Sequence, residues 1–392
     1  MSSNIIVPVR PSDRFGYYQI GDVRTYSKME FIDLQTSFPA DWHWNYNNEF
    51  FSKYNWQQEP IESINELYRR RAQKLRNDND YLILHYSGGY DSSNILYSFL
   101  DNNIPLDEIL IYYSRHDGVS HQYQELSGLT RKKTEQLQKL YPKIKIRYLD
   151  YADFFISWDK NIANYGYGKD LVDVFGSSMT INRFAVDLAH TMVPEWENII
   201  ESGKKLAFVI GVDKPVLRYF NGQWIFNFQD GIVQSNITPL RQMIDDGSLG
   251  RYEFFYWDPC HECAQILIKQ SHLVKQKYDF QARLDFSTIP GHKPFRAGYG
   301  WEIDKMDYEF TRTIYPRLFG HGEGFYIYKN SRFVFGNRDQ WFFQGNHDLS
   351  RKHREMYQSL GGELYSHRRS WYSNNKDIMD GIVNCISPDY II

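Results

Sequence analysis

The stretch Ser87-Gly88-Gly89-Tyr90-Asp91-Ser92-Ser93 decides the fold of this 392-residue chain. It follows an apolar run, Tyr81-Leu82-Ile83-Leu84, and precedes a helical apolar pattern at residues 92–102. The two glycines let the backbone turn sharply and approach an anion, and the start of the following helix offers backbone amides and a positive dipole end. We expect these amides and the serine hydroxyls to wrap a phosphate group.

Two common phosphate-binding motifs do not fit this stretch. The G-x-x-x-x-G-K-[ST] motif needs a lysine before its last hydroxyl residue, and the G-x-G-x-x-G turn spaces its glycines differently. The stretch instead resembles the S-G-G-x-D-S motif of the PP-loop ATP pyrophosphatases, which are adenine nucleotide alpha hydrolase-like proteins. Its doubled serine, Asp91-Ser92-Ser93, is most similar to the synthetase domain of asparagine synthetase. The competing interpretation is a loop that merely reverses the chain.

The resemblance implies a fold, an activity and a set of site residues. The fold is α/β, a parallel doubly wound sheet of the HUP-like kind, and the activity cleaves ATP to AMP and pyrophosphate. The loop holds the pyrophosphate end of ATP, and Asp91 helps to bind Mg²⁺. The implied nucleotide-binding residues of the loop are Ser87, Gly88, Gly89, Tyr90, Asp91, Ser92 and Ser93.

Alternating strand and helix patterns extend from about residue 81 to residue 215. The predicted strands are Tyr81 to His85, Glu108 to Ser114, Lys145 to Tyr148 and Leu206 to Ile210. The predicted helices are Ser92 to Asn102, Leu129 to Leu140 and Asn182 to Ile200. This alternation predicts a parallel sheet with helices on both faces and ligands beyond the carboxyl ends of the strands.

The rest of the chain forms two flanking regions. Residues 1–80 are an N-terminal extension, with a strand-like segment at Asn4 to Arg10 and a helix near Glu62 to Arg76. Residues 216–392 are an aromatic-rich α+β region packed on the core. It has strand-like runs at 223–228, 252–257, 324–329 and 332–335, and a helix at Cys263 to Lys277.

A second loop is predicted to face the first one. The strand ending at Ile210 runs into Gly211-Val212-Asp213-Lys214-Pro215. In asparagine synthetase, a glycine-containing acidic loop at the matching point supplies a second carboxylate, and Asp213 resembles that group. Asp91 and Asp213 would give Mg²⁺ the oxygen ligands it prefers, and Lys214 would neutralise the leaving pyrophosphate. The alternative is a strand end with a solvated Asp-Lys pair.

Three further segments contain candidate contacts to the nucleotide or the substrate. Ser114 and Arg115 end the second predicted strand, where PP-loop enzymes place the adenosine, although an arginine there is as often a surface residue. Two basic segments, Gly291 to Arg296 with Lys293, and Ser366 to Ser370 with Arg368 and Arg369, would reach phosphate or an acidic substrate. Solvated loops are the alternative for both segments.

Cys260-His261-Glu262-Cys263 has the spacing of half a zinc site. Two further ligands, such as Cys385 and either His261 or His272, would be needed. The alternative is a helix start capped by Asp258 with both cysteines packed as small apolar residues.

Composition predicts a cytoplasmic enzyme. The 45 basic and 48 acidic side chains give a formal net charge of −3, so no global field attracts nucleic acid or an anionic membrane. Three cysteines are too few for a disulfide framework. The N-terminal residues do not have the pattern of a secretory signal, and no apolar run is long enough to span a bilayer.

The leading hypothesis is an ATP-dependent, AMP-forming ligase that adenylates a carboxylate or amide oxygen for attack by a nitrogen nucleophile. The first cysteine is Cys260, so the glutaminase nucleophile that follows the initiator Met is absent, and ammonia, an amine or a partner protein would supply nitrogen. One alternative is nucleobase or tRNA modification by adenylation with nitrogen or sulfur transfer, supported by Arg69-Arg70-Arg71 and the cysteine pair. The other is a nucleotide-binding module without catalysis.

Overall fold

The computed structural model describes residues 13–26, 31, 34, 37, 41–113, 130–150, 193–211, 215, 217–220, 222–228, 230, 250–286, 295–297, 306–320 and 387–392. The α/β core, the N-terminal extension and parts of the C-terminal region are all represented. Among the described helices, none is both long and apolar enough to cross a membrane.

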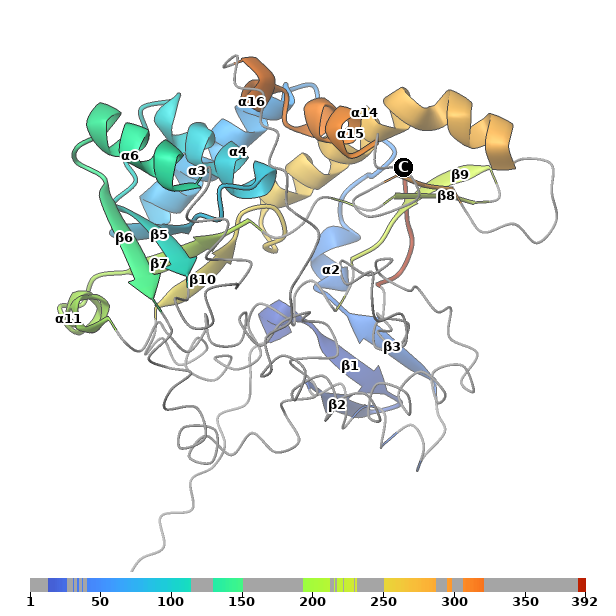
Figure 1. Cartoon of the computed structure of the whole chain (residues 1–392). Coiled ribbons are helices and arrows are strands. Elements are labelled where there is room, and N and C mark those ends of the chain that lie inside the picture. The colour runs from blue at the N-terminus through green and yellow to red at the C-terminus, as the bar shows by residue number, and fades with distance from the viewer. Residues whose placement is uncertain are drawn as a thin grey trace, which may run out of the picture.

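A five-stranded, fully parallel sheet forms the centre of the molecule (Figure 1). Its strands are β4 (Tyr81–His85), β5 (Glu108–Tyr113), β6 (Lys145–Asp150), β7 (Leu206–Ile210) and β10 (Arg251–Phe254), in the spatial order β10-β7-β4-β5-β6. The first four were predicted from their apolar runs, and all four are confirmed. The α/β fold class is confirmed with them.

The order of the strands reverses between β4 and β7. The chain runs outward from β4 to β5 and β6, then returns to the other side of β4 to form β7 and finally β10. In parallel α/β sheets, such a reversal leaves a crevice at the carboxyl ends of the two central strands, which is where ligands bind. The loops after β4 and β7 therefore lie at the position that the topology favours for a site.

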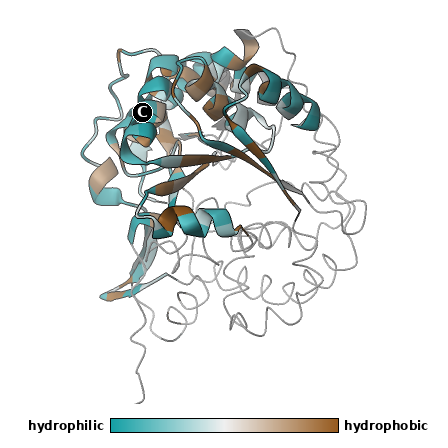
Figure 2. Ribbon diagram, turned by 90° about the vertical axis from the view of Figure 1, so that its left-hand side faces the viewer, coloured by the Kyte–Doolittle hydropathy of each residue, from teal (hydrophilic) through white to brown (hydrophobic). Residues whose placement is uncertain are grey.

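Helices cover both faces of this sheet. In Figure 1, α3 (Ile64–Asp78), α4 (Tyr90–Leu100), α6 (Arg131–Leu140) and α14 (His261–Phe286) lie above the sheet, and α11 (Pro194–Glu201) lies below it. Figure 2 shows the strands in the brown of hydrophobic residues and much of the helical surface in teal. Burial of apolar side chains between these layers is the main stabilising contribution to such a core.

The helix α4 follows its sequence pattern closely. Its side chains Ile95, Leu96, Phe99 and Leu100 are all buried, as their helical spacing predicts. Asp101 is the C-cap residue, and Asn103, two residues later, has a positive φ of 54° that turns the chain away from the helix.

Two smaller antiparallel sheets flank the core. The first has the order β2-β1-β3 and comprises β1 (Tyr17–Ile20), β2 (Val23–Thr25) and β3 (Trp42–Asn45). The second has the order β11-β8-β9-β12. Its strands are β8 (Leu217–Phe220), β9 (Gln223–Phe226), β11 (Phe295–Ala297) and β12 (Tyr390–Ile391).

Short helical segments complete the described structure. They are η1 (Asp13–Phe15) and α2 (Asn48–Phe51) near the N-terminus, and α15 (Met306–Ile314) and α16 (Pro316–Gly320) after α14.

Aromatic side chains join the flanking sheets to the core. Phe228 packs against Tyr46, Phe51, Trp56 and Trp257, with ring centroids 4.5–6.5 Å apart. These rings come from the N-terminal extension and from both sides of β10, and all are buried. Much of the chain's aromatic content therefore holds its regions together.

The sheet extends beyond the predicted nucleotide-binding core of residues 81–215. Its fifth strand, β10, pairs with β7 and comes from residues 251–254. The helix that follows it, α14, packs against α3 of the N-terminal extension.

Candidate functional site

The loop at residues 86–89 joins β4 to α4 and requires glycine at Gly88. The backbone there has a φ of +73°, a left-handed conformation that L side chains rarely adopt. A Cβ atom on Gly88 would lie 2.6 Å from Oγ1 of Thr130, the residue before α6. The hydroxyl of Thr130 donates to the Ser87 carbonyl oxygen at 3.3 Å, so the start of α6 closes over one side of the loop.

Serine hydroxyls gather where α4 begins. The hydroxyl oxygens of Ser87 and Ser92 lie 3.3 Å apart, and the amide of Gly89 donates to the Ser87 hydroxyl at 3.3 Å. The Ser92 hydroxyl donates to the Gly89 carbonyl at 3.2 Å. Ser87 is exposed, so this group of hydroxyls can be reached from solvent.

The start of α4 suits an anion. Gly89 is the N-cap residue and makes no side-chain cap hydrogen bond. The first amides of a helix have no acceptor within the helix and carry the positive end of its dipole. Together with the two hydroxyls, these amides form the kind of surface that binds phosphate oxygens.

Gly211 brings the end of β7 against the start of α4. A Cβ atom on Gly211 would lie 3.3 Å from the Ser92 amide nitrogen and 3.0 Å from Cδ1 of Ile95. The two predicted loops therefore meet, and the segment that carries Asp213 and Lys214 begins beside the first turn of α4. Asp213 and Lys214 themselves lie outside the described residues.

Two tyrosines hold Asp91, and the sequence analysis did not identify either. Tyr315 donates to Asp91 Oδ1 at 2.6 Å, and Tyr256 donates to the Asp91 backbone carbonyl at 3.0 Å. Asn94, one turn along α4, donates to the Tyr256 hydroxyl at 3.0 Å. Burial, with the negative charge of Asp91, raises the pKa of Tyr315, which keeps this hydroxyl protonated as a donor.

The remaining loop residues divide between surface and interior. Tyr90 is partly exposed and stacks on Phe319, with ring centroids 6.3 Å apart. Ser93 is fully buried, and its hydroxyl lies 3.3 Å from that of Tyr86. The contribution of Ser93 to phosphate binding stays a prediction.

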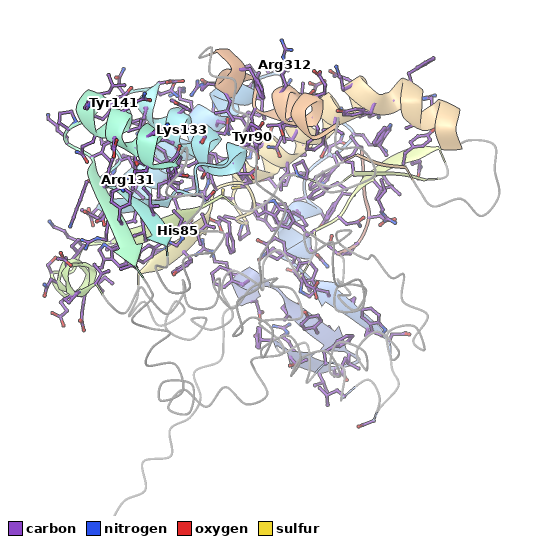
Figure 3. All side chains as sticks on the ribbon, viewed as in Figure 1. His85, Tyr90, Arg131, Lys133, Tyr141 and Arg312 are labelled. Atoms are coloured by element: carbon purple, nitrogen blue, oxygen red, sulfur yellow. The ribbon has the colours of Figure 1, made fainter. Side chains whose placement is uncertain are left out.

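Cationic side chains begin α6 beside the loop. Arg131 and Lys133 lie in its first turn, directly after Thr130, and are marked in Figure 3. Arg131 is exposed and pairs with Glu135, whereas Lys133 is partly buried. Lys214 and Lys293 were the lysines that the sequence predicted for the site, and Arg131 and Lys133 were not among its candidates.

His85 ends β4 immediately before the loop. Its ring packs edge-on against Phe208 of β7 and Tyr252 of β10, at centroid distances of 5.6 and 6.0 Å. Burial lowers the pKa of His85 to about 3, because the charged form loses its hydration. The imidazole is therefore neutral at physiological pH.

Three other predicted site residues lie outside the described part of the chain: Ser114, Arg115 and Lys293. The same holds for the basic segment with Arg368 and Arg369 and for Cys385. The strand β11 includes Arg296, whose backbone pairs in register with Arg218 of β8.

The arginine cluster of α3 divides into surface and interior residues. Arg69 and Arg70 are on the surface and pair with Glu66, and Arg70 also pairs with Glu62. Arg71 is only 1% exposed. The three arginines were predicted to support tRNA binding. Only Arg69 and Arg70 lie on the surface, and both are paired with carboxylates.

Arg71 is held in a buried cluster of charges beneath the start of α14. Its guanidinium group lies 2.6 Å from Asp258 and 3.3 Å from Glu253, and Arg14 lies 3.0 Å from each of these carboxylates. Burial alone would raise the pKa of Glu253, but the hydrogen bond with Asp258 and the charges of Arg14 and Arg71 lower it to about 2.

The cysteine pair lies at the start of α14. Cys260 is partly exposed, and Cys263 is buried with its thiol 3.2 Å from the carbonyl oxygen of Phe255. No group of three or more metal-ligating side chains occurs among the residues that the structure describes. The zinc hypothesis therefore has only this pair as its basis in the described part of the chain.

Comparison with known proteins adds no assignment to this geometry. No protein-family model matches the chain, and no curated protein matches it.

Proposed function

We propose that the protein is an ATP-dependent, AMP-forming enzyme that activates a carboxylate or amide oxygen for attack by a nitrogen nucleophile. The observation that carries this proposal is the placement of the Ser87–Ser93 motif at the carboxyl end of β4, where the strand order reverses and Gly211 packs against α4. A resemblance in sequence and a favoured position for ligands thus coincide.

The triphosphate of ATP would bind at the start of α4. The amides of the first turn and the hydroxyls of Ser87 and Ser92 provide donors for the β- and γ-phosphates. Lys133, three residues after Thr130 on α6, would add positive charge beside the loop. The PP-loop and HUP-like character of the fold is part of the proposal, supported by the strand order and the motif.

The chemistry of these donors also fits Mg²⁺. Asp91 is partly exposed and accepts a hydrogen bond from Tyr315 at Oδ1, and its carboxylate is the kind of oxygen ligand that a hard cation binds. With Asp213 as the second predicted ligand, the ion would be held by carboxylate, phosphate and water oxygens. When bound, it would neutralise the charge of the departing pyrophosphate.

The protein's own part in the reaction is positioning and charge stabilisation. The acceptor oxygen attacks the α-phosphorus, the bond from that phosphorus to the bridging oxygen breaks, and pyrophosphate leaves with its electron pair. The loop amides and Lys133 stabilise the charge on the leaving group. A nitrogen nucleophile then attacks the acyl-adenylate and displaces AMP. No nucleophilic side chain is needed.

The nucleotide products test this proposal. The full chain is incubated with Mg²⁺, ATP labelled at the α-phosphate and a panel of carboxylate and amide acceptors, with and without ammonia. We expect labelled AMP and an equal amount of pyrophosphate with the correct acceptor. Formation of ADP and orthophosphate would overturn the proposal, because the bond broken would then lie between the β- and γ-phosphates.

A further inference from the structure

We infer that Cys260 and Cys263 form a thiol–disulfide exchange site, in which Cys260 attacks small disulfides and Cys263 resolves the mixed disulfide. The function proposed above does not use these residues. The inference rests on their placement at the start of α14, on the different exposure of the two thiols and on the charges around them.

The two thiols are close enough to react with each other. The backbone amide of Ala264 donates to the Cys260 carbonyl at 3.1 Å, so the helical turn already includes Cys260. Residues three apart on a helix have side chains about 5–6 Å apart at Cβ, and a disulfide needs Cα atoms about 4.4–6.8 Å apart. The Cys263 thiol donates to the Phe255 carbonyl oxygen at 3.2 Å, so it must rotate away from this carbonyl to reach the Cys260 sulfur.

The surroundings favour a thiolate at Cys260. The neighbouring Cys263 side chain, the charge of the buried Arg71 and the Cys263 backbone amide together lower the pKa of Cys260 to about 6, although its burial acts in the opposite direction. The start of a 26-residue helix adds the positive end of a dipole. Cysteines in such C-x-x-C positions are reactive because the thiolate is the nucleophile.

The two thiols differ in the way that such a site needs. Cys260 is partly exposed, whereas Cys263 is fully buried and burial raises its pKa. An external disulfide can therefore reach Cys260 only. Cys263 stays protonated until a mixed disulfide forms next to it.

A cavity of about 330 Å³ lies between α3 and the start of α14, and its lining includes Glu262 but not Cys260. Its cations Arg69, Arg70 and Lys74 are paired with the carboxylates of Glu66, Glu62 and Asp78. Glu262 is two residues from Cys260, and the negative charge of Cys260 is among the causes that raise the pKa of Lys74. Glutathione disulfide, a small disulfide with several carboxylates, is a suitable probe.

The exchange balances in electrons and protons. The Cys260 thiolate attacks one sulfur of the disulfide, the disulfide bond breaks, and the first thiolate leaves. Cys263 then attacks the sulfur of Cys260, the second thiolate leaves, and the proton of Cys263 passes to it. The dithiol loses two electrons, and the external disulfide gains two electrons and becomes one thiol and one thiolate, which takes a proton from solvent.

The test uses the full chain with Cys385→Ser, so that only two thiols remain, with folding checked by circular dichroism. After incubation with glutathione disulfide, peptide mass spectrometry should find the peptide with both cysteines lighter by two hydrogen atoms. Cys263→Ser should accumulate one glutathionyl group on Cys260, and Cys260→Ser should remain unmodified. Absence of the internal disulfide, or equal modification of Cys263 in Cys260→Ser, would overturn the inference.

A second measurement does not depend on the oxidant. The rate of iodoacetamide alkylation of Cys260 in the folded chain should be half-maximal near pH 6, and this midpoint should rise in Cys263→Ala because the interaction with the Cys263 side chain is lost. A midpoint near pH 8.5, that of an ordinary thiol, would contradict the role of Cys260 as attacking group.

Discussion

Two strand-to-helix junctions of the same sheet have opposite characters. The glycine junction, residues 86–89, follows β4 and leads into α4 with small residues, hydroxyls and an exposed Ser87. The charged junction, residues 255–260, follows β10 and leads into α14 over the buried ion pairs of Arg71. Both junctions follow the carboxyl ends of parallel strands, which lie at the same edge of the sheet. The comparison shows that the strand topology creates a similar position after both strands. The side chains then determine whether that position is accessible to solvent.

The largest effect is expected at the charged junction. Arg71→Met leaves Asp258 and Glu253 with one guanidinium group fewer in the interior, which should reduce the free energy of unfolding by about 3–5 kcal/mol. Arg69→Met, on the same helix but at the surface, should cost roughly 1 kcal/mol or less. Urea denaturation measures both. Equal losses would mean that burial does not distinguish these arginines.

At the glycine junction, the largest effect should fall on activity. Asp91→Asn keeps the hydrogen-bond acceptor for Tyr315 but removes the negative charge, and should reduce AMP formation by about 10²–10³-fold. The control is Asp78→Asn, a surface residue of α3 paired with Lys74. Quantitative AMP assays with both variants decide the matter, and an Asp91 variant as active as the control would remove Asp91 from the site.

Gly88→Ala tests the shape of the glycine junction. The left-handed conformation should cost roughly 1–2 kcal/mol for a residue with a Cβ atom, and contact with Thr130 should add to this cost. Gly203→Ala is the matched control, because its φ is +80° and a Cβ there meets nothing within 4 Å. Thermal unfolding should show the larger loss for Gly88, and Gly88→Ala/Thr130→Ala should recover part of it. Equal losses would refute the contact.

His85 gives the glycine junction a pH dependence. The pKa of His85 is about 3 in the folded chain, below the ordinary 6.5, so its contribution to stability is complete above pH 6.5 and is lost as the pH falls toward 3. The slope should be at most about 1.4 kcal/mol per pH unit. His85→Phe should flatten the dependence of stability on pH between 6.5 and 4. Urea denaturation at several pH values measures this, and a variant whose stability falls as steeply as that of the unchanged chain would contradict the assignment to His85.

The smallest effect is expected for Tyr315→Phe. Loss of one hydrogen bond to the partly exposed Asp91 should weaken Mg²⁺-dependent ATP binding by about 1 kcal/mol. Tyr390→Phe is the control, because the Tyr390 hydroxyl has no hydrogen-bond partner within the described part of the chain. Calorimetric titration with ATP and Mg²⁺ measures the affinity of each variant. Equal affinities of the two variants would contradict the proposed role of Tyr315.

The sequence predicted those features that depend on local pattern. The apolar run Leu206–Ile210 and the helical face of α4 were placed correctly because strand and helix periodicity is visible within a few residues. The meeting of Gly211 with α4 followed from parallel-sheet topology. The motif also located Asp91 and the serines of the glycine junction.

Long-range contacts were not predictable from the same patterns. Tyr256 and Tyr315 reach Asp91 from 165 and 224 residues away along the chain, and nothing in their local sequence marks them. Arg69, Arg70 and Arg71 look alike in sequence, yet only the face of α3 that packs against α14 buries an arginine. The fifth parallel strand, β10, was predicted as a strand of the C-terminal region, because its paired residues in β7 lie 44 positions upstream.

The pairing of β10 with β7 determines the shortest fragment of the chain that could fold on its own. Every residue of β7 is buried, and β10 covers its outer edge. A fragment ending at residue 215 would expose an apolar strand edge, which is a template for aggregation. An independently folding nucleotide-binding fragment must therefore extend through α14 and include α3, against which α14 packs.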